Sequence, residues 1–431
     1  MKFKFSHIAD CHIGGWRDPR MKELSVEAFD FAITKSIEDK VDFVLIAGDL
    51  FNSAIPGIDA IKSVVSSLNK LKQNNIPCYF IAGSHDFSPN GKTFLDVIEE
   101  AELGVNVYKP SQKDSKMRLK FTVDKKTGVK IAGILGRKGQ LDSEDYDALD
   151  YTSLEKEDGF KIFMFHTSIT EMKPKELEMM QSSSVSVLPV GCDYYAGGHV
   201  HIVERYNSDK YKNVIYPGPL FPNSFSEFQK LKKGGFYIVN VDEEITLDRI
   251  DINLKPVIVF EFNADNMSVE RLNNDMKQRV KKGTFSDAIV LLRVYGTVSS
   301  GKISDINFNE TINSIYEKDA YFVMRNTSKL FVEDMETKNI DSDSSDEIER
   351  ELIIENQGQI KNSFKNEAKA VMQIMNAASS EKLEGEKVYD YESRILSQID
   401  QAIEENKEKE PKGESFGHSN KLKKTKGEGN D

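Results

Sequence analysis

The sequence contains little cysteine and no long hydrophobic run. Its three cysteines are scattered along the chain and form no C-x-x-C pair, which excludes a disulfide-stapled secreted domain and indicates a reducing, cytoplasmic setting. No run of about 18 apolar residues occurs, so we expect no membrane-spanning helix. An apolar strand is predicted to begin by Phe3, and we therefore expect no secretory signal before it.

The sequence also lacks the basic excess that is common in nucleic-acid-binding domains. It has 58 Lys and Arg against 70 Asp and Glu, a net charge of -12. Residues 331–431 carry 15 basic and 24 acidic side chains, or -9, which leaves -3 for residues 1–330. Most of the negative charge is therefore at the C-terminal end. The remainder is nearly neutral, so a nucleic-acid partner is not excluded.

Short Asp/His clusters follow apolar runs that are typical of buried β-strands. Between the first three clusters lie helical patterns, one of them with Ile58, Ile61, Val65 and Leu68 on a single face. Strands that alternate with helices predict a largely parallel α/β sheet, which binds ligands beyond the carboxyl ends of its strands. All the clusters fall at such ends: Asp10–His12, Gly48–Asp49, Gly83–Asp86, His166 and Gly198–His201.

The residue types in these clusters favour a metal site. Neutral imidazole and carboxylate together suit manganese, iron or zinc, and four clusters offer histidine while three offer aspartate. These are more ligands than one tetrahedral ion needs, but enough for two ions that share a carboxylate. Two such ions about 3.5 to 4 Å apart can clamp a phosphoryl centre and lower the pKa of a bound water. The pattern predicts phosphoester hydrolysis. His7, which alternates with Phe3 and Phe5, is expected to pack or to support the ligands.

The motifs D-x-H, G-D, G-S-H-D, H and G-H-x-H, in this order, resemble the calcineurin-like metallophosphoesterases. Within that group the sequence is similar to the SbcD, or meiotic-recombination-eleven, type of DNA double-strand-break repair nuclease. The resemblance covers about the first 240 residues and extends more loosely to about 330. The segments that carry it are GDLFN at 48–52, IAGSHDFSPNGK at 81–92, FHTSI at 165–169, GGHVH at 197–201 and YPGPLFPNSF at 216–225.

The resemblance implies Mn²⁺ as the cofactor, two ions per chain, and a role for each motif residue. His85 would face the scissile phosphate, where it would stabilise charge or protonate the leaving oxygen, and Asp86 would orient its imidazole. Asp49 would bridge the two ions. The first ion would bind Asp10, His12, Asp49 and His201, and the second Asp49, Ser84, His166 and His199.

The pattern and the resemblance together predict an α/β fold in several parts. A calcineurin-like metallophosphoesterase core of packed sheets flanked by helices is followed by a small α/β capping domain without histidine. C-terminal helices come after a linker, and their apolar stripe needs a covering partner or the enzyme body itself. The predicted parts are a nuclease domain at 1–250, the capping domain at 255–330, an acidic linker at 331–346, partner-binding helices at 347–405 and a disordered tail at 406–431.

The resemblance implies a manganese-dependent DNA nuclease with 3′–5′ exonuclease and endonuclease activity. It would process DNA ends in double-strand-break repair, near the nucleoid, as a homodimer. The C-terminal helices would hold the coiled coil of an SMC-like ABC ATPase. The helix near 58–75 is a candidate dimer interface, or it is covered by the sheet. Basic side chains expected to contact DNA, or to be ordinary solvated surface, are Arg137, Lys138, Lys232 and Lys233.

Two other classes of function remain open at this point. One is a small-molecule phosphodiesterase or phosphatase of the same superfamily, against which the sequence lacks the G-D-x-x-D-R-G motif of protein phosphatases. The other is a non-catalytic DNA-end scaffold, with Ser84 as a sign of decay. The remaining predicted ligands and His85 are all present, and buried charges without a function would be costly to keep.

Ser84 departs from the family motif, in which an asparagine precedes the histidine. A hydroxyl is shorter and a weaker ligand than a carboxamide oxygen, so we expect the second ion to bind more weakly than it would to asparagine. Three stronger ligands for that ion remain. Calorimetric titration of manganese into the wild type and a Ser84→Asn variant should show tighter binding of the second ion in the variant. Equal affinity for the second ion would contradict this expectation.

Overall fold

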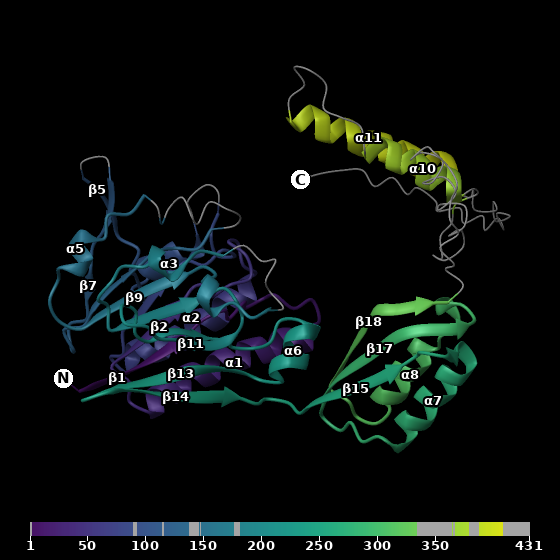
Figure 1. Ribbon diagram of the computed structural model, residues 1–431, viewed down its shortest axis with the longest axis horizontal. Helices are drawn as coiled ribbons and strands as arrows, with labels where there is room; N and C mark the ends of the chain where they lie inside the picture. The colour runs from purple at the N-terminus through teal and green to yellow at the C-terminus, as the bar shows by residue number, and fades with distance from the viewer. Residues whose placement is uncertain are drawn as a thin grey trace, which may run out of the picture. The chain divides into compact units, whose positions relative to one another are not determined.

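A computed structural model describes most of the chain (Figure 1). The chain divides into two units, residues 1–333 and 334–431. No helix in the described part has the length and apolar character that a membrane span requires. The described residues are 2–88, 93–113, 116–137, 146, 148–175, 182–333, 364, 367–378 and 388–407.

The first sheet of unit 1 has six strands in the order β14-β13-β1-β2-β3-β4. Strands β1 to β4 are parallel, and β13 and β14 extend the sheet as an antiparallel pair. Helices α1 (Pro19–Glu38) and α2 (Ile58–Gln73) make the crossovers between the first three strands. The strands are β1 (Phe3–Ile8), β2 (Phe43–Ala47), β3 (Cys78–Ile81), β4 (Val105–Asn106), β13 (Gly234–Val241) and β14 (Ile245–Ile252).

The second sheet also has six strands, in the order β11-β12-β10-β9-β8-β7. Its central strands β12, β10, β9 and β8 are parallel. The edge strands β11 and β7 are antiparallel to their neighbours. The strands are β7 (Thr122–Val123), β8 (Lys130–Gly133), β9 (Lys161–His166), β10 (Tyr194–Gly198), β11 (Val203–Tyr206) and β12 (Val214–Pro217).

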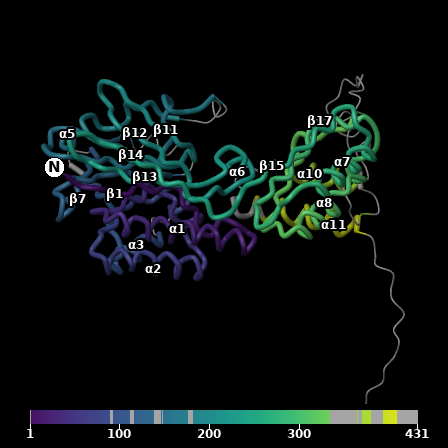
Figure 2. The backbone as a smooth tube through the Cα atoms, turned by 90° about the horizontal axis from the view of Figure 1, so that it is seen from below, coloured from purple at the N-terminus to yellow at the C-terminus, as the bar shows by residue number. Residues whose placement is uncertain are grey.

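The two sheets pack face to face, and helices cover the other face of the first sheet. Between the sheets, the ring of Phe5 stacks on Phe43 at 5.0 Å and meets Tyr194 edge-on at 5.1 Å. Alternate residues of β1 and β2, such as Ile8 and Val44, instead pack with α1 and α2. Figure 2 shows these layers, with α1, α2 and α3 (Phe94–Glu100) below β13 and β1, and with β11 and β12 above. The predicted core of packed sheets flanked by helices is confirmed.

Smaller elements complete the first part of unit 1. A hairpin joins β5 and β6, and short helices lie in the connections. They are β5 (Pro110–Lys113), β6 (Lys116–Leu119), α5 (Thr152–Glu155), α6 (Phe225–Leu231) and the 3-10 turns η1 (Thr170–Met172) and η3 (Val185–Val187).

Residues 257–332 form a third sheet with its own helices, which we call the cap. Strand β17 (Ile289–Ser300) is central and pairs in parallel with β15 (Val257–Asn263), β16 (Met267–Ser268) and β18 (Phe322–Val332). The apolar sides of its helices and strands share a buried core that includes Leu272, Met276, Val290, Leu292 and Ile315. The remaining elements are α7 (Val269–Lys282), η4 (Ile303–Asp305) and α8 (Phe308–Tyr316).

Unit 2 contains two described helices, α10 (Glu367–Ala378) and α11 (Val388–Asn406), which pack against each other. Ala370 and Ala402 are buried, and the amide of Asn406 donates to Gln373 Oε1 at 2.6 Å. Most of the predicted acidic linker, the first part of the predicted partner-binding helices at 347–405 and residues 408–431 of the predicted tail lie outside the described residues.

Candidate metal centre

The ends of five strands bring the Asp/His clusters together. Asp10 and His12 follow β1, Asp49 follows β2 and His85 follows β3, all from the first sheet. The second sheet contributes His166, the last residue of β9, and His199 and His201 after β10. Parallel strands end at one edge of a sheet, and the two packed sheets present these edges on the same side. The structure groups Asp10, His12 and His201; His12, Asp49 and His85; and Asp10, Asp49 and His166.

The backbone at these residues is held in an unusual conformation. Asp10, His12, Asp49 and His201 have φ values of 51°, 44°, 51° and 53°, and His199 has 100°. A positive φ costs a non-glycine residue roughly 1–3 kcal/mol, and five of the thirteen such residues in the described structure lie at this site. The turns direct these side chains away from their strands and towards one another.

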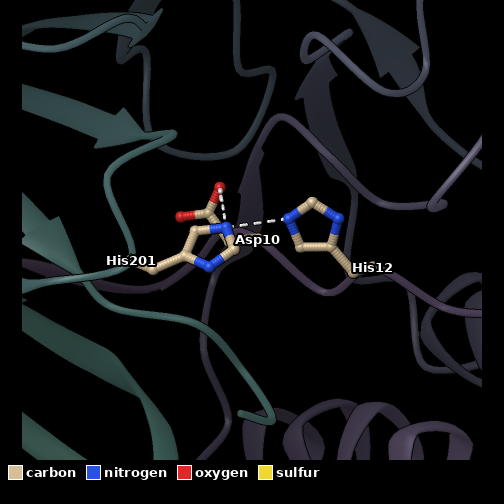
Figure 3. A group of neighbouring side chains, drawn as sticks. All are labelled: Asp10, His12 and His201. Atoms are coloured by element: carbon tan, nitrogen blue, oxygen red, sulfur yellow. Dashed lines mark hydrogen bonds and ion pairs between the residues drawn. The ribbon is translucent and has the colours of Figure 1, made fainter. Parts of the chain in front are cut away.

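Asp10, His12 and His201 form the first group (Figure 3). The Nε2 atoms of His12 and His201 lie 2.8 Å apart, and His201 Nε2 lies 3.9 Å from Asp10 Oδ1. Two imidazole nitrogens at this distance are stable only if they share a proton or a cation. In the described structure, His12 Nδ1 is buried and has no hydrogen-bond partner.

Asp49 lies between this group and His166. Its Oδ2 is 3.6 Å from His12 Nε2 and 3.1 Å from His166 Nε2. The approach is possible because Gly48 has no side chain, since a Cβ there would lie 2.2 Å from His166 Nδ1. The other ring nitrogen of His166, Nδ1, is 2.8 Å from the carbonyl oxygen of Ala47. Asp49 therefore has histidines on both sides, which suits a carboxylate that bridges two cations.

Burial and the charges of neighbouring groups raise the pKa values of some side chains in this site and lower those of others. Burial raises the pKa of Asp10 to about 6 and lowers the pKa of His12 to about 3. Burial also opposes charge on His166 and on Asp49, but their attraction outweighs it, so the pKa of His166 rises to about 10 and that of Asp49 falls. A divalent cation would replace protons at such a site. The buried donor set of carboxylate and imidazole fits such an ion.

His199 lies beside this set. Its backbone N–H donates to Asp10 Oδ1 at 2.8 Å, and its ring centroid is 5.2 Å from that of His166. Burial lowers the pKa of His199 to about 3, so its imidazole is neutral at ordinary pH. A neutral imidazole is the form that binds a metal ion.

His85 and Ser84 both contact Asp49. The backbone N–H of His85 donates to Asp49 Oδ1 at 2.7 Å, and the Ser84 hydroxyl donates to Asp49 Oδ2 at 3.5 Å. His85 Nδ1 lies 3.0 Å from the carbonyl oxygen of Asn52. Because a carbonyl only accepts, Nδ1 carries the proton, and Nε2 is the ring nitrogen left for a substrate.

Asp86 has a different role from the predicted one. Its carboxylate accepts the backbone N–H groups of Leu50 and Gly83 at 3.1 Å and of Phe51 at 2.9 Å. The prediction that Asp86 orients the imidazole of His85 is wrong, because Asn52 supplies that contact. Asp86 instead ties the turn after β3 to the turn after β2, which holds Asp49 beside His85.

Glu227 also contacts the site, at a place that was not expected from the sequence. It lies on α6, and its Oε1 is 3.1 Å from His201 Nδ1. Its backbone N–H donates to Ser224 Oγ at 3.2 Å, and its Oε2 accepts the N–H of Asn223 at 2.8 Å. The S-x-x-E spacing of 224–227 is a helix-capping pattern that could have placed this carboxylate at a helix start, but not beside a histidine 26 residues earlier in the sequence.

His7 contacts strand β10, which precedes His199 and His201. It is fully buried, with Nδ1 2.9 Å from the Tyr194 hydroxyl and Nε2 3.2 Å from the carbonyl oxygen of Gly197. Both ring nitrogens are thus used by strand β10. This agrees with the expected packing or supporting role.

The four predicted DNA contacts remain predictions. Arg137 lies with its guanidinium 5.3 Å from the ring centroid of Phe87, and Lys138 lies outside the described residues. Lys232 is exposed at the end of α6, while Lys233 pairs with Asp251 at 2.7 Å.

Comparison with known proteins agrees with this site. The family model of the calcineurin-like phosphoesterases matches residues 3–203. The DNA double-strand break repair protein Mre11 of Thermoplasma acidophilum is 30% identical over 306 residues, 68% of this chain and 77% of that protein. The chain belongs to the Mre11 family of calcineurin-like phosphoesterases. The resemblance expected from the motifs is therefore confirmed, and the centre is that of a metal-dependent phosphoesterase.

Other relatives of the same name extend the likeness further along the chain. The Mre11 protein of Archaeoglobus fulgidus is 24% identical over 446 residues, which cover 95% of this chain and 97% of that protein. That of Methanococcus maripaludis is 29% identical over 324 residues, 69% of this chain and 83% of that protein. The similarity to the Archaeoglobus protein thus includes the segment that contains α10 and α11.

Replacing Glu227 should weaken metal binding without removing a predicted ligand. A carboxylate that holds a ligating histidine typically contributes about 10- to 100-fold to metal affinity, so we expect a loss of that order for Glu227→Ala in calorimetric titration with manganese. Glu227→Gln is the matched control, because its amide oxygen can still accept from His201 Nδ1, and it should lose less. Wild-type affinity in Glu227→Ala would contradict the role assigned to Glu227.

Proposed function

We propose that this chain is a two-metal, manganese-dependent nuclease that processes DNA ends in double-strand-break repair. The observation that carries the proposal is the placement of Asp49, a buried carboxylate 3.6 Å from His12 and 3.1 Å from His166. Membership of the Mre11 family supports DNA as the substrate, since the relatives are named for double-strand break repair.

The proposed ligands form two sets that share Asp49. When bound, the ions would polarise the phosphodiester and activate a water for attack. Ser84 is the weakest member, because its hydroxyl already donates to Asp49 Oδ2. The first set is Asp10, His12, Asp49 and His201, and the second is Asp49, Ser84, His166 and His199.

His85 would act on the substrate directly. Its Nδ1–H is fixed by the Asn52 carbonyl, so Nε2 can face the phosphate and, when protonated, donate to the leaving oxygen. Its backbone N–H is anchored on Asp49 Oδ1, which keeps the imidazole next to the proposed bridging carboxylate. Asp86 would contribute by holding the two turns together, without contact with the reacting atoms.

The proposal extends to polarity, partners and assembly. Exonuclease action would run 3′ to 5′, beside endonuclease action near DNA ends. Helices α10 and α11 would bind an SMC-like ABC ATPase, and Leu396 on α11 is an apolar side chain left 62% exposed. A homodimer would use the start of α2 and the turn before it, where Ile58 and Ile55 are 82% and 89% exposed.

The nuclease assignment is tested by DNA degradation. End-labelled linear duplex and a closed single-stranded circle are incubated with manganese, magnesium or chelator. We expect manganese-dependent cleavage, and a loss of about 10²- to 10⁴-fold in His85→Gln, the range for a general acid. His418→Gln, in the C-terminal region outside the described residues, is the matched control and should cleave as the wild type does.

Each outcome of this assay separates the candidate functions. Cleavage that is unaffected by His85→Gln would contradict the role of His85. If DNA stays intact while bis-p-nitrophenyl phosphate is hydrolysed, the small-molecule phosphodiesterase is the correct function. If neither is cleaved, even with the ATPase partner added, the nuclease proposal is wrong.

A further inference from the structure

Helix α6 touches three different parts of unit 1 through three consecutive residues. Glu227 contacts His201 of the metal centre, Phe228 packs on Trp16, and Gln229 reaches the cap. Successive side chains on a helix point about 100° apart, so three consecutive residues of a short helix can contact three different neighbours. Ser224 caps the start of the helix, and Phe228 is 1% exposed, which fixes α6 as a rigid element.

Gln229 binds the cap through both ends of its amide. Its Nε2 donates to Glu261 Oε1 on β15 at 2.9 Å, and its Oε1 accepts from an Arg293 guanidinium nitrogen on β17 at 2.9 Å. Glu261 and Arg293 are direct neighbours in the parallel pairing of these strands and form an ion pair at 3.8 Å. Each bond has one charged member, and such hydrogen bonds are stronger than neutral ones. The donor end of the amide therefore meets the carboxylate of the cap ion pair, and its acceptor end meets the guanidinium.

Aromatic contacts reinforce this joint. Trp16 lies between α6 and the cap, with ring centroids 6.0 Å from Phe228 and 6.4 Å from Phe322 of β18. The cap is held at a second place, where Arg20 of α1 donates to the Tyr321 carbonyl at 2.8 Å. Loss of the Gln229 contact should therefore loosen α6 from the cap while the cap stays attached through α1.

We infer that α6 makes the position of His201 depend on the position of the cap, with Gln229 as the positioning residue. A displacement of β15 and β17 would move Gln229, and Glu227 two residues earlier on the same rigid helix would shift the imidazole of His201. Such coupling is reciprocal: an ion at His201 would favour one cap position, and a substrate that moves the cap would change the affinity for the ion. The inference rests on the metal centre proposed above.

The test changes the cap and measures the metal centre. Glu261 lies on the cap strand β15, and Glu261→Ala removes the acceptor of Gln229 without altering α6. We expect Glu261→Ala, which removes one of the two hydrogen bonds of Gln229, to weaken manganese binding by about threefold to tenfold. Gln229→Ala removes both bonds and should weaken it at least as much. The double variant should bind manganese no more weakly than Gln229→Ala alone, because Gln229→Ala already removes the bond that Glu261→Ala breaks. Calorimetry on the whole 431-residue chain measures all four affinities.

Glu310→Ala is the matched control in the cap. Glu310 pairs with Lys277 at 3.2 Å, an ion pair between α8 and α7, so its loss should leave manganese affinity unchanged. Trp16 is the only tryptophan of the chain and gives a second readout. Manganese should change its fluorescence in the wild type and in Glu310→Ala, and the change should be smaller in Gln229→Ala.

The outcomes separate this inference from the function on which it rests. Wild-type manganese affinity in both Gln229→Ala and Glu261→Ala would overturn the coupling while the metal centre stands. Additive losses in the double variant, or an equal loss in Glu310→Ala, would also overturn it, because the effect would then not pass through the Gln229 link. A wild-type chain that binds no manganese would overturn the metal centre and the coupling together.

Discussion

Asp49 is buried between His12 and His166, and the rest of the centre is arranged around this carboxylate. An unpaired charge at such a place would be strongly unfavourable, but here oppositely charged or hydrogen-bonding groups meet both oxygens. Oδ1 accepts the backbone N–H of His85, and Oδ2 faces His166 Nε2 at 3.1 Å. Glycine at position 48 leaves the space for this approach. The packing of two sheets, which places five strand ends together, supplies the ligands that the carboxylate joins.

The strand-end clusters made much of this centre predictable from the sequence. Asp10, His12, Asp49 and His166 converge as expected because each follows or ends a parallel strand. The partner of His85 was not predictable in the same way. A neighbouring aspartate in the sequence suggested Asp86, but the chain turns at Gly83 so that this carboxylate accepts three backbone N–H groups, and a backbone carbonyl at Asn52 has no sequence signature.

Contacts between segments far apart in the sequence could also not be predicted. Glu227 and Gln229 read as ordinary polar residues of a short amphipathic helix, and only the tertiary structure places one beside His201 and the other beside Glu261. The α/β structure of the cap, in contrast, is local in sequence, since its strands and helices follow one another from Val257 to Val332, close to the range 255–330 predicted for the capping domain. Local hydrophobic periodicity thus predicts the helices and strands, while the contacts between them depend on how the sheets pack.

We propose above all that two divalent ions share Asp49. Crystals grown with manganese and measured at its absorption edge would test it most directly, because anomalous scattering locates manganese atoms without reference to activity. We expect two peaks about 3.5 to 4 Å apart with Asp49 between them. One should lie beside Asp10, His12 and His201, and the other beside His166 and His199. A single peak, or peaks that do not contact Asp49, would contradict it.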